Sequence, residues 1–129
     1  MQAPFLHCED PAIRHGEPLL RREDMGKWVF YPKKGREQDE LWTRLYGLYY
    51  ARELPGVHSM AATTMASETT HELAPGQVHA HCGPYTDQDK VLQVGRQMVE
   101  RLKYWCQRGH IGYRMGDANG FLYKLEVSK

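Results

Sequence analysis

The sequence predicts an α+β fold, in which an antiparallel sheet carries two helices on one face. Two long segments repeat apolar residues at the spacing of one helical face, and strand-like segments twice follow one another with no helix between them. Strands joined without a helical crossover pair antiparallel. Helices that bury one stripe then cover one face of the sheet, and the opposite face is the candidate site.

The first half of the chain predicts a strand and a helix. Residues 27–31 combine β-branched and aromatic side chains and end at Pro32, which is typical of a strand followed by a turn. Because strand side chains alternate, Trp28 shares one face with Phe30, while Lys27 lies on the other. A helix is expected over residues 37–53, where apolar residues follow the i, i+4, i+7, i+8 spacing: Leu41, Leu45, Leu48 and Tyr49.

A pair of strands is expected in the middle of the chain. Residues 57–65 are rich in small and β-branched side chains, and a polar loop over residues 66–76 follows them. Residues 77–82 alternate in the pattern of a half-buried strand. That alternation places Cys82 with the apolar side chains and His79 and His81 on the opposite face.

The last part of the chain predicts the second helix and two closing strands. Thr86 stands at the position of an N-cap, and an apolar stripe extends from Val91 to Trp105, so the helix is expected to end near Gln107. Residues 111–115 and 121–127 then read as a hairpin, with a Gly-rich connection over residues 116–120.

Composition limits the class of protein. The chain has 129 residues with 17 Lys and Arg against 16 Asp and Glu, which gives a net charge of +1 and no general attraction to nucleic acid or to an anionic membrane. We expect an N-terminal arm over residues 1–25 and one domain over residues 26–129. The three cysteines form no CxxC pair, no apolar run is long enough to span a bilayer, and the first residues have no signal-peptide pattern. A cytoplasmic protein is therefore expected.

Several side chains invite a chemical role, and each has a structural explanation as well. Two histidines on one strand face can share a metal only with further ligands, which no recognised spacing supplies. Cys82 next to them has the elements of a nucleophile, but its buried face favours a packing role. Trp42 and Trp105 continue helical stripes, so core positions are expected for both. Neither a metal nor another cofactor is expected.

Basic residues supply a second candidate chemistry. Those that would converge on a phosphate group are Lys27, Lys33, Lys34, Arg36, Arg44 and Arg114. A solvated charged surface is the simpler interpretation for most of them. The glycine-rich phosphate loops and the serine hydrolase motif do not occur in the sequence.

Five short motifs follow one another along the chain: Gly26-Lys27-Trp28, Asp39-Glu40-Leu41-Trp42, the segment from Leu54 to Thr63, the segment from Tyr85 to Val91, and Gly112-Tyr113-Arg114. In this order they resemble the basophilic-leukaemia-expressed protein family, whose domain is similar in fold to the eukaryotic mRNA cap-binding translation initiation factor. The resemblance covers residues 24–125. It implies a curved antiparallel sheet with helices on the convex side and a concave, ligand-facing side.

The resemblance implies less about activity. A phosphothreonine lyase activity suggested for the family needs a lysine base and a histidine acid that we cannot place here. The chain has Met60 where the family pattern favours a lysine, and Arg114 where a lysine is usual. Only Trp28 matches a family tryptophan near the working face of the sheet, so a cap-binding aromatic pair does not carry over.

Three functions remain as hypotheses. The first is a non-catalytic binding module for a nucleotide-like or phosphorylated ligand on the concave face, lined by Trp28, His58, His79, His81, Tyr113 and Arg114. The second is a small adaptor or inhibitor that docks on a partner protein through the arm and three tyrosines: Tyr49, Tyr50 and Tyr85. The third is an enzyme with His79 or His81 as a general acid or base and Arg114 as an anion stabiliser. An enzyme is the least favoured of the three.

Overall fold

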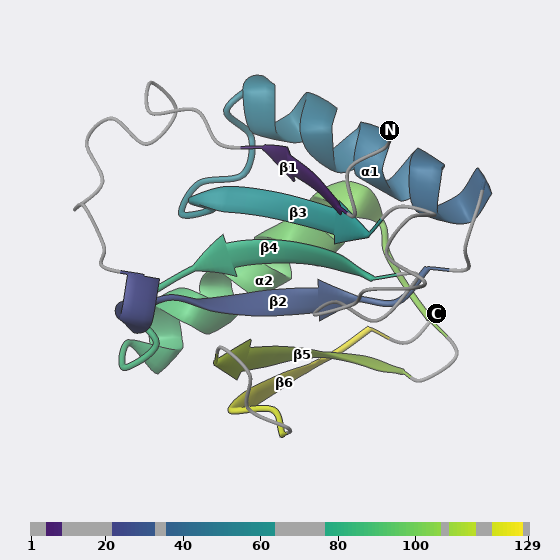
Figure 1. Ribbon diagram of the computed structural model, residues 1–129. Helices are drawn as coiled ribbons and strands as arrows, with labels where there is room; N and C mark the ends of the chain where they lie inside the picture. Colours follow the sequence, from purple (N-terminus) through teal and green to yellow (C-terminus); the bar gives the residue numbers. More distant parts are fainter. Residues whose placement is uncertain are drawn as a thin grey trace.

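The computed structural model describes residues 5–8, 22–32, 36–63, 77–106, 109–115 and 120–127. Within these ranges the chain forms two α-helices and six strands, which Figure 1 shows in their arrangement. In chain order the elements are β1 (Phe5–Cys8), a 3-10 turn (Arg22–Asp24), β2 (Gly26–Phe30), α1 (Arg36–Tyr50), β3 (Ser59–Thr63), β4 (Val78–Cys82), α2 (Gln88–Leu102), β5 (His110–Met115) and β6 (Tyr123–Glu126).

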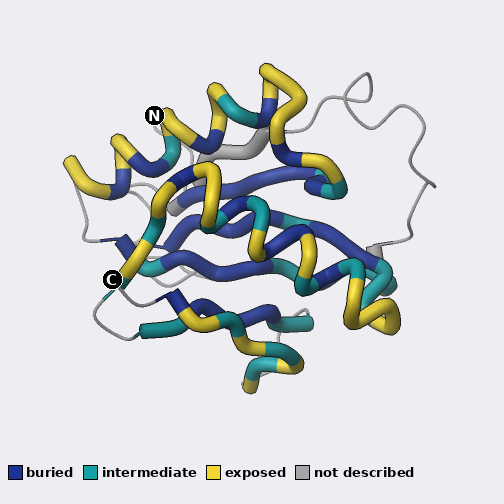
Figure 2. Tube along the Cα trace, turned by 180° about the vertical axis from the view of Figure 1, so that it is seen from behind, coloured by how far each residue is buried: buried dark blue, intermediate teal, exposed yellow. Residues whose placement is uncertain are grey.

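The six strands form one sheet in the order β1-β3-β4-β2-β5-β6, and every neighbouring pair is antiparallel. Both helices lie on the same face of this sheet, behind it in Figure 1 and in front of it in Figure 2. The predicted fold class is therefore confirmed, as a curved antiparallel sheet with two helices on one side. The amphipathic stripes explain the arrangement, because each helix turns its buried residues toward the sheet and its exposed residues outward (Figure 2).

The main core lies between the helices and the sheet. It combines the two helical stripes with one side chain in two from the central strands, and Trp28, Phe30 and Tyr113 are its largest strand members. Trp28 packs so closely on α2 that a Cβ on Gly95 would lie 2.7 Å from its indole ring. A glycine at that position therefore lets the helix approach the sheet.

The ends of the second helix differ from the prediction. Asp87, not Thr86, is the N-cap, because its carboxylate accepts a hydrogen bond from the backbone N–H of Lys90 at 3.2 Å. The helix ends at Leu102, and Lys103 adopts the left-handed conformation that closes a helix. Trp105 therefore lies beyond the helix with 47% of its surface exposed, and its expected core position is wrong. Trp42 is partly buried against the core, as expected.

The predicted N-terminal arm contributes a strand. Residues Phe5–Cys8 pair with β3 at one edge of the sheet, although no alternation in the sequence indicated a strand there. An edge strand needs only one neighbour, so a weak pattern is enough to add it. The predicted loop over residues 66–76 lies outside the described residues, and so do residues 116–119 of the predicted connection over residues 116–120. The division of the chain at residue 25 stays a prediction.

Candidate ligand-binding face

The face of the sheet opposite the helices carries a row of polar side chains. The register sets Ser59 on β3 opposite His81 on β4, His81 opposite Lys27 on β2, and Lys27 opposite Arg114 on β5. Side chains directly opposite each other on neighbouring strands begin about 5 Å apart. We call Lys27, His81 and Arg114 the cationic row, since two of them are positively charged and the third can be protonated.

The cationic row lies at one end of the sheet, and the sheet next to it is buried. Lys27, His81 and Arg114 are each half-buried. One step further along the strands, Val29 and His79 expose 0% and 1% of their surface. The charged groups therefore lie at the border of a region from which water is excluded, which we call the dry region and which includes Val29 and His79. Charges interact more strongly there than in water.

The surroundings of His79 lower the pKa of its imidazole. Burial, followed by the charges of Lys27, His81 and Arg114, lowers its pKa from 6.5 to about 2. The imidazole is therefore neutral at physiological pH. Its Nε2 lies 2.8 Å from Oε1 of Gln77, which is the contact of a ring N–H donating to an amide oxygen.

Arg114 has unused hydrogen-bonding capacity. Its Nε atom is buried and makes no hydrogen bond to any residue in the described part of the chain. A buried donor without an acceptor costs about 1–3 kcal/mol, and more when the donor is charged. An anionic oxygen at this position would remove that cost.

His58 lies beside the row and does not belong to it. It precedes β3, where its ring Nδ1 is 3.2 Å from the hydroxyl of Ser59. Its backbone N–H donates to the carbonyl of His81 at 2.8 Å, and its own carbonyl accepts from the hydroxyl of Tyr49. Ser59 thus links the ring of His58 to the end of the cationic row.

Two predicted ligand-binding residues are in the wrong place for that role. Trp28 and Tyr113 are fully buried on the helix side of the sheet, where their rings meet edge to face. The indole N–H of Trp28 donates to the carbonyl of Val91, and the hydroxyl of Tyr113 donates to the carbonyl of Cys82. The alternation of β2 was predicted correctly, but its large aromatic side chains face the helices because only that side buries enough apolar surface.

Two residues considered for catalysis, His79 and Cys82, have pKa values that do not suit the roles expected of them. Because the pKa of His79 is lowered to about 2, the imidazolium form that a general acid requires is not populated at neutral pH, and the neutral ring is a weak base. Burial raises the pKa of the Cys82 thiol to about 12, so the thiolate that a nucleophile requires does not form. Among the described residues no three potential metal-ligating side chains lie together.

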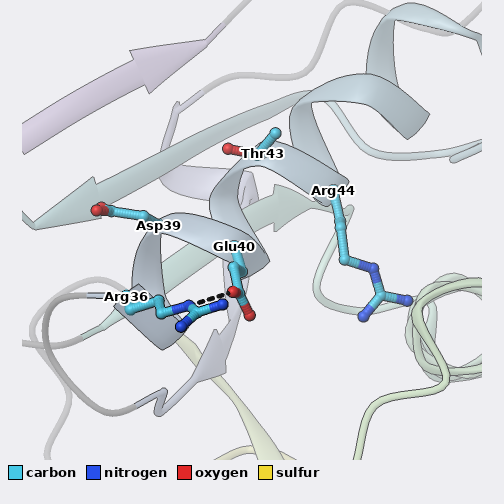
Figure 3. A pocket seen from close by; sticks show the side chains of 5 residues that line it. All are labelled: Arg36, Asp39, Glu40, Thr43 and Arg44. Carbon is cyan, nitrogen blue, oxygen red and sulfur yellow. Dashed lines mark hydrogen bonds and ion pairs between the residues drawn. The ribbon is translucent and has the colours of Figure 1, made fainter.

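Other predicted basic residues lie on the far side of the molecule. A shallow hollow of about 560 Å3 on the outer side of α1 is lined by five residues: Arg36, Asp39, Glu40, Thr43 and Arg44 (Figure 3). Arg36 pairs with Glu40 at 2.9 Å, and Arg44 donates to the carbonyl of Leu102. These arginines are held by acceptors on the helix layer, so they do not join Lys27 and Arg114. Lys33 and Lys34 lie outside the described residues.

The three tyrosines predicted as docking residues differ in how far they are exposed. Tyr49 is fully buried, so it cannot be an interface anchor, and Tyr85 is half-buried. Tyr50 is 43% exposed on α1, and Tyr46, one turn earlier, is 47% exposed. Their ring centroids are 4.7 Å apart, which makes a small aromatic surface on the outer side of the helix.

Sequence reasoning missed two residues of this face. The sequence predicts Lys27 as a phosphate contact without grouping it with the histidines, although its alternation with Trp28 is a signal that places it on their face. Phe121 was assigned to a strand, yet its ring lies over Gly112, where a Cβ would meet it at 2.2 Å. No periodic pattern indicates such a contact, because Phe121 precedes β6.

Comparison with known proteins identifies the fold. No family model and no curated protein sequence matches the chain. Two solved structures of schistosome eIF4E, in complexes with 4E-BP and either m7GpppA or m7GpppG, each match with a TM-score of 0.60 at 14% sequence identity. Each match covers 80% of this chain, whereas the chain spans only 60% and 59% of those two proteins. The likeness shows an eIF4E-like fold. No helix in the described part of the chain is long and apolar enough to cross a membrane.

Proposed function

We propose that this protein is a non-catalytic binding module that holds a phosphorylated or nucleotide-like ligand at the cationic row. The register of three neighbouring strands carries the proposal, since it brings Lys27, His81 and Arg114 together at the border of a dry region. Arg114 contributes a buried Nε donor that no described residue accepts from, so an anionic oxygen beside it would supply the missing partner. Guanidinium and ammonium groups are the side chains that bind phosphate most strongly.

The structural neighbours support a nucleotide as the first ligand to test. The two schistosome proteins were solved with m7GpppA and m7GpppG, which are nucleotides with a phosphate chain. Membership in the basophilic-leukaemia-expressed protein family is also proposed, from the order of the sequence motifs alone. A cytoplasmic location fits a protein with this composition.

The test is isothermal titration calorimetry with inorganic phosphate, GMP and m7GTP. We expect the wild type to bind at least one of them, and Arg114→Ala to weaken that binding about tenfold, as expected for the loss of a hydrogen bond to a charged group. Arg96→Ala is the matched control, because Arg96 is exposed on α2, on the opposite side of the sheet. No heat with any of the three ligands, or equal affinity for the two variants, would contradict the proposal.

A protein-docking function is the second candidate, and the exposed tyrosine pair on α1 supports it. Tyrosine is enriched in interface hot spots, and the two rings lie side by side on the exposed side of α1, tilted by 45° to each other. The test is affinity capture with the double variant Tyr46→Ser and Tyr50→Ser. We expect loss of a partner that the wild type and Leu122→Ser both retain, Leu122 being equally exposed on another surface.

A further inference from the structure

Phe121 forms an aromatic surface on the same side of the sheet as the cationic row. Its ring lies directly on the backbone of Gly112, since a Cβ on Gly112 would be 2.2 Å from Cδ1 of Phe121. A Cβ at position 112 would lie on the face of the sheet away from the helices. Arg114, two residues later on β5, has its side chain on the same face. Phe121 is half-buried, so one side of the ring rests on the strand and part of the ring reaches solvent.

The ring is also held in place from the side. The imidazole of His110 meets it edge to face, with ring centroids 6.4 Å apart. Any side chain larger than hydrogen at position 112 would force the ring off the strand, so the glycine and the phenylalanine form one fitted unit. Phe121 is therefore a fixed flat surface, not a flexible exposed side chain.

The distance to the cationic row suits a small ligand. Residues two apart on one strand face are separated by roughly 7 Å, so Gly112 under the ring and Arg114 in the row are neighbours on β5. Lys27 lies opposite Arg114, and Val29 lies opposite Gly112. A flat ring and an anionic group joined by one sugar would contact Phe121 and the row together.

We propose that Phe121 is the stacking platform of the site, so that the ligand is a nucleoside phosphate and not a phosphorylated compound without an aromatic ring. This inference rests on the proposed function and specifies its ligand class. The cationic row binds the phosphate, and the exposed part of the Phe121 ring stacks on the base. Stacking on an aromatic side chain is tolerant of base identity, because every base has a flat face.

The contact between Phe121 and Gly112 also supports the sheet, since an aromatic ring covers the exposed backbone of a strand glycine. The experiment must therefore separate stacking from stability. Phe121→Leu keeps an apolar side chain over Gly112 but removes the flat ring. Phe121→Tyr keeps the ring, and Leu122→Ala changes an exposed neighbour that does not cover Gly112.

Calorimetry with GMP and with ribose 5-phosphate tests the inference. We expect Phe121→Leu to weaken GMP about tenfold and to leave ribose 5-phosphate unchanged, because only GMP has a base to stack. Phe121→Tyr, which keeps the flat ring, should bind GMP more tightly than Phe121→Leu does, and Leu122→Ala should bind both compounds like the wild type.

Three outcomes overturn the inference. Equal weakening of both compounds by Phe121→Leu would show a structural role only, and unchanged GMP binding would remove Phe121 from the site. In either case the cationic row would still bind phosphate. A wild type that binds neither compound would instead overturn the proposed function, and the stacking role with it.

Discussion

The two faces of the sheet bury different chemistry, although the same strands build both. On the helix side, β2 and β5 bury Trp28 and Tyr113 in an apolar core. On the other side, the residues next to them are Lys27 and Arg114, and the neighbouring buried side chains are Val29 and the neutral imidazole of His79. Burial of apolar side chains favours folding, whereas burial of the ionisable groups on the second face opposes it.

This contrast assigns stability to one face of the sheet and the candidate binding site to the other. Burying ionisable groups lowers stability, so a cluster of them at one end of a sheet is a candidate binding site, and the large apolar side chains opposite are the source of stability. Alternation along each strand assigns neighbouring residues to the two roles. Three substitutions test this division, and each has a matched control on another part of the molecule.

Trp28→Ala should give the largest effect. It removes a fully buried side chain from the core, and we expect the free energy of unfolding to fall by about 3–5 kcal/mol. Urea denaturation followed by circular dichroism measures the loss. Trp105→Ala is the control and should cost less than about 1 kcal/mol, because Trp105 is 47% exposed. A stable Trp28→Ala protein that had lost only ligand binding would reverse the assignment of the two faces.

Tyr113→Phe should give an intermediate effect. The hydroxyl of Tyr113 donates to the carbonyl of Cys82 at 2.6 Å and accepts from the backbone N–H of Gly26 at 2.8 Å. Losing it leaves two buried backbone groups with one partner fewer, at a cost of about 1–3 kcal/mol. The same denaturation experiment on Tyr46→Phe, whose ring is exposed, should show no change. Unchanged ligand affinity in Tyr113→Phe is expected, since the hydroxyl lies on the core side.

The pH dependence of stability tests the opposite face. Because the pKa of His79 falls from 6.5 in the unfolded chain to about 2 in the folded protein, the unfolded state binds a proton between these values and the folded state does not. The contribution of His79 is fully present above pH 6.5 and is lost as the pH falls toward 2. Between pH 6.5 and pH 5 the free energy of unfolding should fall by about 2 kcal/mol.

His79→Gln removes this titration. Urea denaturation at pH 7, 6 and 5 gives the free energy of unfolding as a function of pH. For this variant the slope should be smaller than that of the wild type, by the equivalent of about one bound proton. Leu122→Ala, which removes no titratable group and changes an exposed side chain on another part of the molecule, is the control and should keep the slope of the wild type. If His79→Gln and the wild type have the same slope, His79 is not the buried neutral group of this face.

Much of the fold could be predicted from the sequence, but less of the site. The stripe of α1 and the alternation of β4 are local patterns, so both elements and the burial of Cys82 follow from them. The last turn of α2 could not be read in this way. Trp105 continues the stripe, yet the left-handed Lys103 ends the helix two residues earlier.

His79, His81 and Arg114 lie on the helix-free face, whereas Trp28 and Tyr113, which were expected there, lie on the helix side. Alternation gives the relative position of two neighbours but not which of the two faces the helices cover. Phe121 lay beyond prediction for another reason. Its position over Gly112 depends on the path of the chain before β6, and no periodicity records that path.

The sequence by itself determined the α+β class, the two helices, the antiparallel strands and the separation of Lys27 from Trp28, because each depends on residue spacing within one element. Tertiary structure alone decided that Lys27, His81 and Arg114 form a row, since they come from three strands whose register no single segment contains. It also decided which face is dry enough to hold His79 neutral. Pairing between strands distant in the chain is a collective property of the packed sheet, and the binding site depends on that property.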